Sequence, residues 1–447
     1  MTRDLTTSHP LKIIVEFAIP VFFGYLFQQL YNVVDTIIVG RFLGVQNLAA
    51  VGSTGSLHFL IMGFCIGLCS GFAIPVAQKF GAGDYKTMRS FVFNSYVLLV
   101  FFSVVLTVLT LFFCRPLLIL LKTPSDVLEG ADDYFGVILK GIPVVLFYNL
   151  LASIIRSVGD SKTPLYFLVL SAVLNIILDL LFIAVFDFGV KGAACATVIA
   201  QAVSMVLCWF YMQNHFELLR LKKEDCILSK RRIRGLLGAG LPMGLQYSIT
   251  AIGSVILQSA VNALGSVFVA AMATGQKISM FFSTPFDSLG TTMATYAGQN
   301  VGAHKIERLN SGLFWACLLG AVYSIMALCV LYFFSNSIIS LFMDRGESAS
   351  VSQNVIQNAR FFLLCNGVTY FLLALVNIVR FMIQGMGFSK TAVFAGIFEL
   401  IGRSTIGVWI VPLLGFKGAC LASPLAWVLA DAFLIPAFFY CQKKLKG

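Results

Sequence analysis

The sequence predicts an all-α polytopic membrane protein in which twelve transmembrane helices form two six-helix bundles. Composition is the first reason, because 59% of the 447 residues are hydrophobic and only 11% are charged. About a quarter of the residues of a soluble globular protein are charged, so this composition excludes that class. The second reason is the uncharged stretches at 95–114 and 311–343, which are long enough to cross a bilayer with about 20 residues. The third reason is an internal repeat.

The apolar runs, taken in order, predict where the membrane helices lie. They are separated by short polar or charged segments, so that six runs fall in each half of the chain. The expected helices are residues 13–40, 47–74, 91–114, 133–156, 164–187, 191–214, 235–263, 267–297, 311–335, 357–384, 391–413 and 418–440.

The distribution of Lys and Arg predicts the orientation, because short cytoplasmic loops are enriched in them. With the N-terminus inside, 20 of the 31 basic residues lie in inner segments. Both termini are therefore expected in the cytoplasm, and the net charge of +11 reflects this bias and no nucleic-acid site. Six basic residues would lie outside: Arg41, Arg115, Lys122, Lys191, Arg345 and Lys417.

A basic segment at 215–234, which contains the sequence KKEDCILSKRRIR, divides the chain almost evenly. We interpret it as a solvated cytoplasmic linker that can touch anionic headgroups. This is favoured over a regulatory or nucleic-acid site. The expected domains are therefore 1–214, the linker 215–234, and 235–447.

Four motifs recur in the same order in the two halves, which indicates an internal repeat. Residues 77–82 (AQKFGA) return as 298–303 (GQNVGA), 159–163 (GDSKT) as 387–391 (GFSKT), and 189–193 (GVKGA) as 415–419 (GFKGA). Pro20 corresponds to Pro242, and each is a candidate bend point or a passive helix irregularity. Six spans per repeat is an even number, so the halves should be related by an axis along the membrane normal.

Polar side chains that interrupt apolar helices mark the candidate site, because charges within a bilayer are costly and usually functional. Asp35 lies in the first expected helix, Asn175 and Asp179 lie one turn apart in the fifth, and Thr197 lies in the sixth. Their distances from the helix ends place all of them at a similar depth, in the outer half of the first bundle. Their oxygens could bind Na⁺ or share a proton, or they could simply hydrogen-bond helices together.

The first helix carries a polar stripe that leads to Asp35. Gln28, Tyr31, Asn32 and Asp35 are spaced three or four residues apart, so they lie on one helix face.

The second half lacks acids at the matching positions and carries other intramembrane charges. Lys277 lies in the eighth expected helix, and Glu399 and Arg403 lie in the eleventh, where i,i+4 spacing permits an ion pair. The ion pair either locks that bundle structurally or has a gating or coupling role. Asp287 and Asp431 are further intramembrane acids for which the sequence suggests no partner.

Several of these motifs resemble signatures of the multidrug and toxic compound extrusion (MATE) family, within the MOP flippase superfamily. They are residues 32–41 (NVVDTIIVGR), 156–164 (RSVGDSKTP), 298–303 (GQNVGA) and 385–390 (GMGFSK). The spacing of Asn175 and Asp179 is similar to the DinF-like branch. The seventh expected helix lacks the acid found in NorM-type members, which argues against a sodium site of that type in the second half.

The resemblance implies a V-shaped pair of bundles that exports organic cations in exchange for H⁺ or Na⁺. It implies a cation-coupling site at Asp35, Asn175, Asp179 and Thr197, and a substrate cavity lined by Gln28, Tyr31, Asn32 and Asn149. It also implies small organic cations and membrane lipids as partners, no nucleic acid, no cofactor and a monomer. We expect such a protein in the plasma membrane of a bacterium or archaeon.

The alternative function is a flippase for lipids or lipid-linked oligosaccharides. Such a protein should line its cavity with Lys and Arg, whereas the expected site in the first half is acidic. An enzyme is disfavoured because the sequence has no HExxH, GxSxG or P-loop motif. The choice between H⁺ and Na⁺ stays open, since both ions use the same oxygens.

Overall fold

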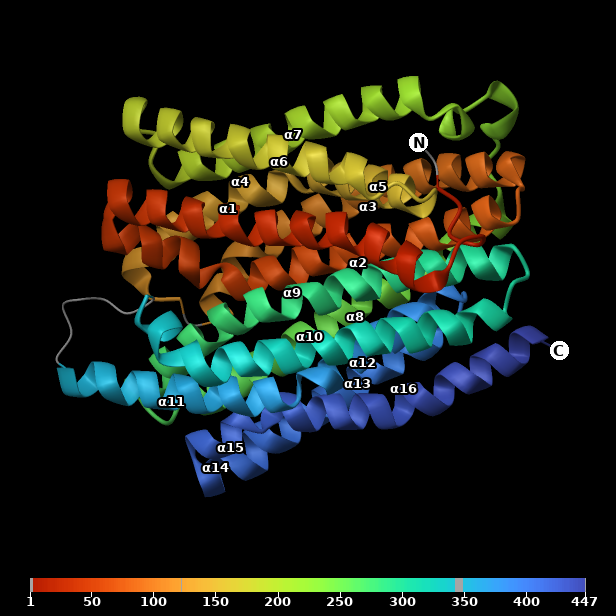
Figure 1. The fold of residues 1–447 in the computed structure, drawn as a ribbon. Coiled ribbons are helices and arrows are strands. Elements are labelled where there is room, and N and C mark those ends of the chain that lie inside the picture. The colour runs from red at the N-terminus through yellow and green to blue at the C-terminus, as the bar shows by residue number, and fades with distance from the viewer. Residues whose placement is uncertain (1–2, 122, 342–348, 447) are drawn as a thin grey trace. The chain divides into compact units, whose positions relative to one another are not determined.

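The computed structural model describes residues 3–121, 123–341 and 349–446, and over these residues it is built of helices and contains no strand (Figure 1). The all-α prediction is therefore confirmed. Lys122 and Arg345, which were expected in outer loops, lie outside the described residues.

The helices of the first half follow the predicted apolar runs. A break at Gly44 divides the first long helix, and the part after the break leads into the second predicted span. The elements are α1 (Pro10–Ser53), α2 (Gly55–Gly81), α3 (Tyr85–Leu120), α4 (Ser125–Lys140), α5 (Ile142–Ser157), α6 (Lys162–Asp179), the π-helix η1 (Leu180–Val185) and α7 (Gly189–His215).

The linker and the second half continue the same pattern. The elements are the 3₁₀ turns η2 (Glu217–Leu219) and η3 (Lys223–Asp225), α8 (Lys230–Asn262), α9 (Ser266–Gly302), α10 (Glu307–Ser340), α11 (Ala349–Val368), α12 (Tyr370–Gly385), α13 (Ser389–Thr405), the π-helix η4 (Ile406–Ile410), α14 (Val411–Leu414), α15 (Phe416–Cys420) and α16 (Ala422–Lys446).

Length and apolar composition identify the membrane-spanning helices among the described residues. Nine helices qualify alone, and two bent pairs bring the number to eleven. The pairs are α4 with α5, bent by 47°, and α11 with α12, bent by 51°. Helix α9, which carries Lys277 and Asp287, is not among these eleven and accounts for the remaining predicted span. The chain is an integral membrane protein.

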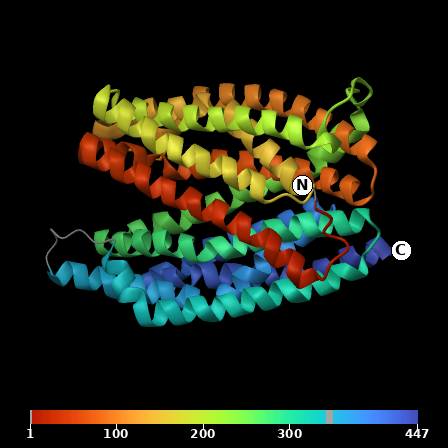
Figure 2. The same cartoon turned by 45° about the horizontal axis from the view of Figure 1, so that its top comes forward.

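The described residues form two compact units, which we call unit 1 and unit 2. Unit 1 contains residues 1–7, 19–248 and 298–304, and unit 2 contains 8–18, 249–297 and 305–447. The chain passes from unit 2 to unit 1 one residue before Pro20, within α1. The start of α1 therefore belongs to unit 2, although it lies in the first half of the sequence. The domain boundaries expected at 214 and 235 stay a prediction. Figure 1 and Figure 2 both show the helices within each unit running side by side.

The backbone of the second half repeats irregular features of the first at nearly the offsets found in the sequence. Both halves contain a π-helix, and η1 and η4 begin 226 residues apart. Residues with positive φ, a conformation that favours glycine, recur at four matching positions of the two halves. The pairs are Gly44 with Gly265, Gly83 with His304, Gly159 with Gly387, and Gly189 with Gly415. The repeat predicted from four motifs is therefore also a repeat of backbone conformation.

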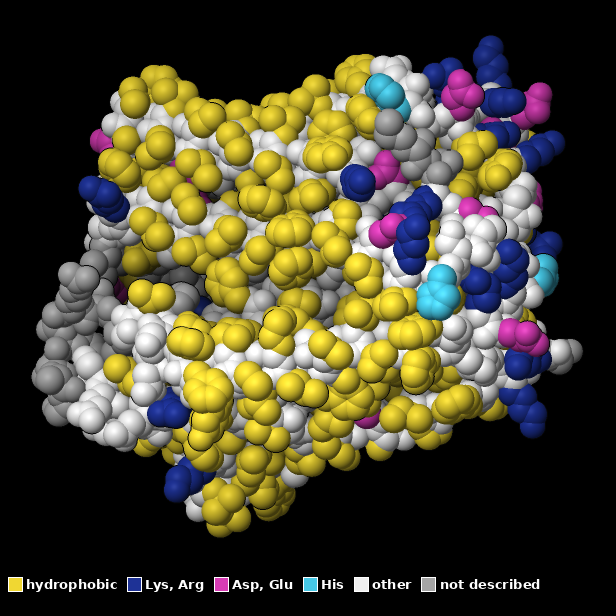
Figure 3. All heavy atoms as spheres, viewed as in Figure 1, with side chains coloured by type: hydrophobic (Ala, Val, Ile, Leu, Met, Phe, Trp, Pro, Cys, Tyr) yellow, Lys and Arg dark blue, Asp and Glu magenta, His cyan; other side chains and the backbone are white. Residues whose placement is uncertain are grey.

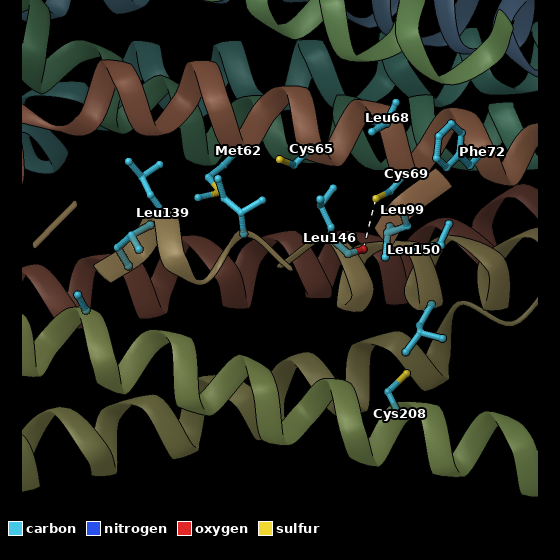
Figure 4. Close-up of a cluster of buried hydrophobic side chains, with 14 of the residues drawn as sticks. Met62, Cys65, Leu68, Cys69, Phe72, Leu99, Leu139, Leu146, Leu150 and Cys208 are labelled. Carbon is cyan, nitrogen blue, oxygen red and sulfur yellow. Dashed lines mark hydrogen bonds between the residues drawn. The ribbon is translucent and has the colours of Figure 1, made fainter. Parts of the chain in front are cut away.

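A dense apolar core fills unit 1 between α2, α3, α5 and α7 (Figure 4). Cys69 is fully buried there, and its thiol donates a hydrogen bond to the carbonyl oxygen of Leu146 at 3.4 Å. Because lipid is as apolar as these side chains, close packing and such polar contacts hold the helices together. The cysteines of this core are free thiols.

Glycines allow helices of unit 1 to approach one another closely. A Cβ atom on Gly67 would lie 2.5 Å from the carbonyl oxygen of Met243, so α2 and α8 pack backbone to backbone. Gly81 and Gly302, which belong to the first repeated motif, make reciprocal contacts. A Cβ on Gly81 would lie 2.0 Å from the Gln299 carbonyl oxygen, and one on Gly302 would lie 1.8 Å from that of Gln78.

The surface of unit 1 separates apolar from charged side chains. Exposed hydrophobic residues follow one face of α3, where Phe112 is 75% exposed, as expected for a helix that faces lipid. In Figure 3 charged side chains gather near the linker between α7 and α8, while hydrophobic ones cover the middle of the helices.

Most of the linker is exposed, as expected for a solvated segment, but it is also anchored to α3. The Asp225 side chain is buried and pairs with Arg89 Nε at 2.6 Å. Asn94 donates to the Ile227 carbonyl oxygen at 3.0 Å and accepts from the Ser229 amide at 3.0 Å. These contacts fix the linker to unit 1.

Candidate functional site

The polar stripe of α1 meets the end of α6 inside unit 1. Asp35 is 9% exposed, and Asp179 is fully buried at the last residue of α6. The π-helix η1 begins directly after Asp179. Such segments leave the regular helical hydrogen-bond ladder and are frequent at functional sites.

The carboxyl groups of Asp35 and Asp179 lie within hydrogen-bonding reach of each other when one of them carries a proton. Among the described residues, no donor reaches either carboxyl oxygen of Asp179 or the Oδ1 atom of Asp35. Neither acid forms an ion pair with a described basic residue. Two buried acids without a cationic partner can hold a mobile cation between them.

Asn175 and Thr197 complete the predicted set of four. The Asn175 amide donates to Thr197 Oγ1 at 3.3 Å, and the Thr197 hydroxyl donates to the Ala193 carbonyl oxygen at 3.2 Å. The amide oxygen of Asn175 is buried and accepts no hydrogen bond from the described residues. Helices α6 and α7 therefore present an acceptor beside the acid pair.

A cavity of about 180 Å³ lies within unit 1, next to these residues. Asp35 and Thr197 line it, whereas Asn175 and Asp179 are buried beyond its wall. All four side chains predicted for the substrate cavity, Gln28, Tyr31, Asn32 and Asn149, line it as well.

Further polar residues line the cavity that sequence reasoning did not identify. Tyr134 of α4 lies near both acids and Tyr31, and Gln201 lies near the Tyr31 hydroxyl. Gln201 lies one helical turn after Thr197, so its spacing was a usable signal. Arg156 also lines the cavity and donates to Ser153 Oγ at 3.1 Å.

The charge cluster predicted for the second half is formed in unit 2 with a different membership. Arg403 Nη2 lies 3.6 Å from Glu399 Oε2, as the i,i+4 spacing predicted. Arg380 of α12 forms a second ion pair with Glu399. Lys277 lies on an exposed face of α9 and forms no ion pair with the described residues. The sequence missed Arg380 because its partner lies on another helix.

No group of three or more His, Cys, Asp or Glu side chains in the described part of the chain is arranged to hold a metal ion. The oxygens available at the site in unit 1 come from two carboxylates, an amide and a hydroxyl.

The chain has long membrane-spanning helices, an internal repeat and a polar cavity inside one unit. These features are typical of a polytopic membrane transporter. The chain belongs to the MatE family, because the sequence model of that family matches residues 20–181 and 242–409. It is therefore a member of a transporter family and not of an enzyme family.

Individual relatives agree with this assignment. The chain is 29% identical over 386 residues to the "Probable multidrug resistance protein YpnP" of Bacillus subtilis (strain 168), with 85% of each protein covered. It is 22% identical over 442 residues to the "FAD transporter" of Shewanella oneidensis (strain MR-1), with 97% of this chain and 94% of that protein covered.

A solved structure has the same fold. It is described as an "Outward-facing conformation of a multidrug resistance MATE family transporter of the MOP superfamily". The TM-score is 0.89 at 24% sequence identity, covering 99% of this chain and 97% of that one.

Proposed function

We propose that this protein exports small organic cations in exchange for H⁺ or Na⁺, and that Asp35, Asp179, Asn175 and Thr197 couple the two movements. The observation that carries this proposal is the buried acid pair without a cationic partner beside a cavity within unit 1. The name of the Bacillus subtilis relative supports drugs as the substrate class. The assignment to the DinF-like branch, the cytoplasmic termini and the monomeric state remain predictions.

Competition for one negative charge supplies the coupling. When the acids are ionised, the cavity attracts an organic cation through Asp35, with apolar and aromatic contacts from residues such as Tyr31 and Tyr134. When H⁺ or Na⁺ reaches the acids, it neutralises them and weakens cation binding. Exchange requires this difference in affinity, because a ligand that binds both states equally shifts nothing.

The acid pair favours H⁺ over Na⁺ as the exchanged ion. Two carboxyl groups within hydrogen-bonding reach can share a proton without any further ligand. Sodium would use the same carboxylate oxygens together with the Asn175 amide oxygen and the Thr197 hydroxyl. Exchange for H⁺ would therefore require a pH gradient, whereas exchange for Na⁺ at the same site would require a Na⁺ gradient.

Efflux of a fluorescent organic cation from proteoliposomes, under a pH gradient or a Na⁺ gradient applied separately, tests this function. We expect Asp35→Asn and Asp179→Asn each to reduce gradient-driven efflux to the level of protein-free liposomes. Asp187→Asn is the matched control, because Asp187 is an exposed loop acid near Asp179 in sequence and asparagine tolerates its positive φ. Normal efflux by both site variants would refute the coupling site.

A second candidate function is the transport of an anionic metabolite or the flipping of a lipid or lipid-linked oligosaccharide. The Arg156 side chain on the cavity wall supports it, as does the likeness to a protein named FAD transporter. In the same proteoliposomes, gradient-independent movement of a lipid-linked sugar, or uptake of an anion that Arg156→Gln abolishes, would favour this candidate.

A further inference from the structure

Unit 2 contains a buried charge network that the proposed exchange at Asp35 and Asp179 does not use. Its centre is Glu399 of α13, which is 3% exposed and pairs with Arg380 and with Arg403. The Arg403 guanidinium also donates to the Thr250 carbonyl oxygen and to Ser254 Oγ, each at 3.2 Å. Both guanidinium groups are thus held in place within the membrane-spanning part of the unit.

Asp431 of α16 lies beside this network without joining its hydrogen bonds. Helix α16 packs against both α12 and α13, and the Asp431 carboxyl interacts electrostatically with Arg380. Asp431 is 4% exposed, and no donor among the described residues reaches either of its oxygens. A buried carboxylate that lacks both a donor and a bonded cation is costly, so this group points to a missing ligand.

Asp287 of α9 interacts with the same guanidinium but is exposed. Its side chain is accessible on the surface of unit 2, and Arg380 acts on it electrostatically. Arg380 therefore interacts with three carboxyl groups, one bonded, one buried and unbonded, and one exposed.

The charges of the network do not balance when every group is ionised. Arginine keeps its charge in proteins, so Arg380 and Arg403 supply two positive charges. Glu399, Asp431 and Asp287 supply three negative ones. A single bound proton makes the network neutral, which is the state a membrane interior favours.

We infer that the network is a second ion site of this transporter, in which the buried Asp431 carboxyl binds a proton. Binding forms an O–H bond on the Asp431 carboxylate, while the O–H bond of the hydronium ion that delivers the proton breaks and leaves water. With Asp431 neutral, Arg380 keeps its ion pair with Glu399, which is the arrangement observed. With Asp431 ionised, its charge competes with Glu399 for Arg380 and loosens the contact between α12 and α13.

Few other ionisable groups act on Asp431. Arg380 faces it from α12, and Glu399 and Arg403 of α13 act through Arg380. Cys317 of α10 is also close to Asp431. Lys277 of α9 is exposed and forms no ion pair with the described residues.

Infrared difference spectroscopy of the purified protein tests the proton on Asp431 directly. A protonated carboxyl group gives a C=O band that shifts in D₂O. We expect the wild type to show such a component that Asp431→Asn loses, while the double variant Asp35→Asn, Asp179→Asn keeps it. If Asp431→Asn folds and the band is unchanged, Asp431 does not hold the proton and the inference is wrong.

Proton uptake on acidification provides the second measurement. When an alkaline sample is brought to about pH 6, above the ordinary range of Asp, Asp431→Asn should take up about one proton fewer per molecule than the wild type. Asp187→Asn, which removes an exposed acid, is the matched comparison and should take up as many protons as the wild type. If Asp431→Asn does not fold, Asp431→Glu keeps the acid and should move the infrared band without removing it. An unmoved band in Asp431→Glu, or equal proton uptake in Asp431→Asn, would overturn the inference. These results do not depend on whether Asp35 and Asp179 couple transport.

Discussion

Unit 1 and unit 2 share a repeated backbone, but the Asp35 and Asp179 pair of unit 1 and Glu399 of unit 2 have opposite charge surroundings. In unit 1, Asp35 and Asp179 face each other beside a cavity and form no ion pair with a described basic residue. In unit 2, Glu399 is held between two arginines. The difference teaches that a repeat can preserve helices and loops while one copy holds two facing acids without an ion pair and the other holds Glu399 between two fixed positive charges.

The largest effect is expected where the fixed charges of unit 2 are broken. Glu399→Gln leaves Arg380 and Arg403 without their counter-ion, and removing one partner of a buried ion pair costs about 3–5 kcal/mol. Thermal unfolding in detergent should show a large drop. The combined variant Arg380→Met, Glu399→Leu, Arg403→Met should recover most of the loss, because apolar residues replace the whole set. A Glu399→Gln protein as stable as the wild type would mean that the ion pairs are not structural.

A substitution in unit 1 is expected to raise the free energy of unfolding instead of lowering it. Asp179→Asn removes a buried carboxyl group that faces a second acid, so the free energy of unfolding should rise by about 1–3 kcal/mol. Thermal unfolding at neutral pH measures it, and Asp187→Asn should change stability by less than about 0.5 kcal/mol. A loss of stability in Asp179→Asn would indicate that Asp179 contributes to the packing of unit 1.

The anchored linker gives a smaller, pH-dependent effect. Burial alone raises the pKa of the Asp225 carboxyl, but hydrogen bonds from Arg89 and the Lys222 amide outweigh burial and hold the pKa below its usual value. A lowered pKa stabilises the fold above the unfolded value of about 4, and this stability is lost as the pH falls through the folded value.

Asp225→Asn should therefore lose about 1–3 kcal/mol at neutral pH and show less further loss in acid than the wild type. Unfolding followed across the acid range tests it. Identical pH profiles for the two proteins would show that the linker contact does not stabilise the fold.

The smallest effect is expected at the helix contact beside the acids. Thr197→Val removes the hydrogen bond from Asn175, and such bonds in membrane proteins contribute about 0.6 kcal/mol. Stability should change little, while the ion dependence of efflux should shift if the hydroxyl is an ion ligand. Thr36→Val, which removes an exposed hydroxyl of α1 bonded to its own helix, is the control. If the ion dependence of efflux does not shift, the Thr197 hydroxyl is not an ion ligand and only holds the two helices together.

Much of the candidate site in unit 1 followed from spacing along single helices. Gln28, Tyr31, Asn32 and Asp35 share a face of α1, and a regular helix fixes that relationship. Sequence reasoning missed Tyr134 and Gln201, because a lone tyrosine and a lone glutamine in apolar runs resemble ordinary helix contacts. It likewise paired Glu399 with Arg403 but left out Arg380.

The linker shows the same limit. A run of charges predicts solvent exposure, and most of the segment is exposed. Asp225 is nevertheless buried because Arg89, 136 residues earlier, provides its counter-charge. Nothing in the local pattern identifies that partner.

The sequence alone determined the number and order of the membrane helices, the repeat and the family. These depend on apolar length, loop composition and motif order, which are properties of neighbouring residues. Only the tertiary structure decided which buried charges are neutralised, because an ion pair such as that of Arg380 with Glu399 joins two helices whose facing sides no local pattern specifies. It also decided that Asp35 and Asp179 meet, since shared depth in a bilayer brings two helices level but only packing turns their side chains towards each other.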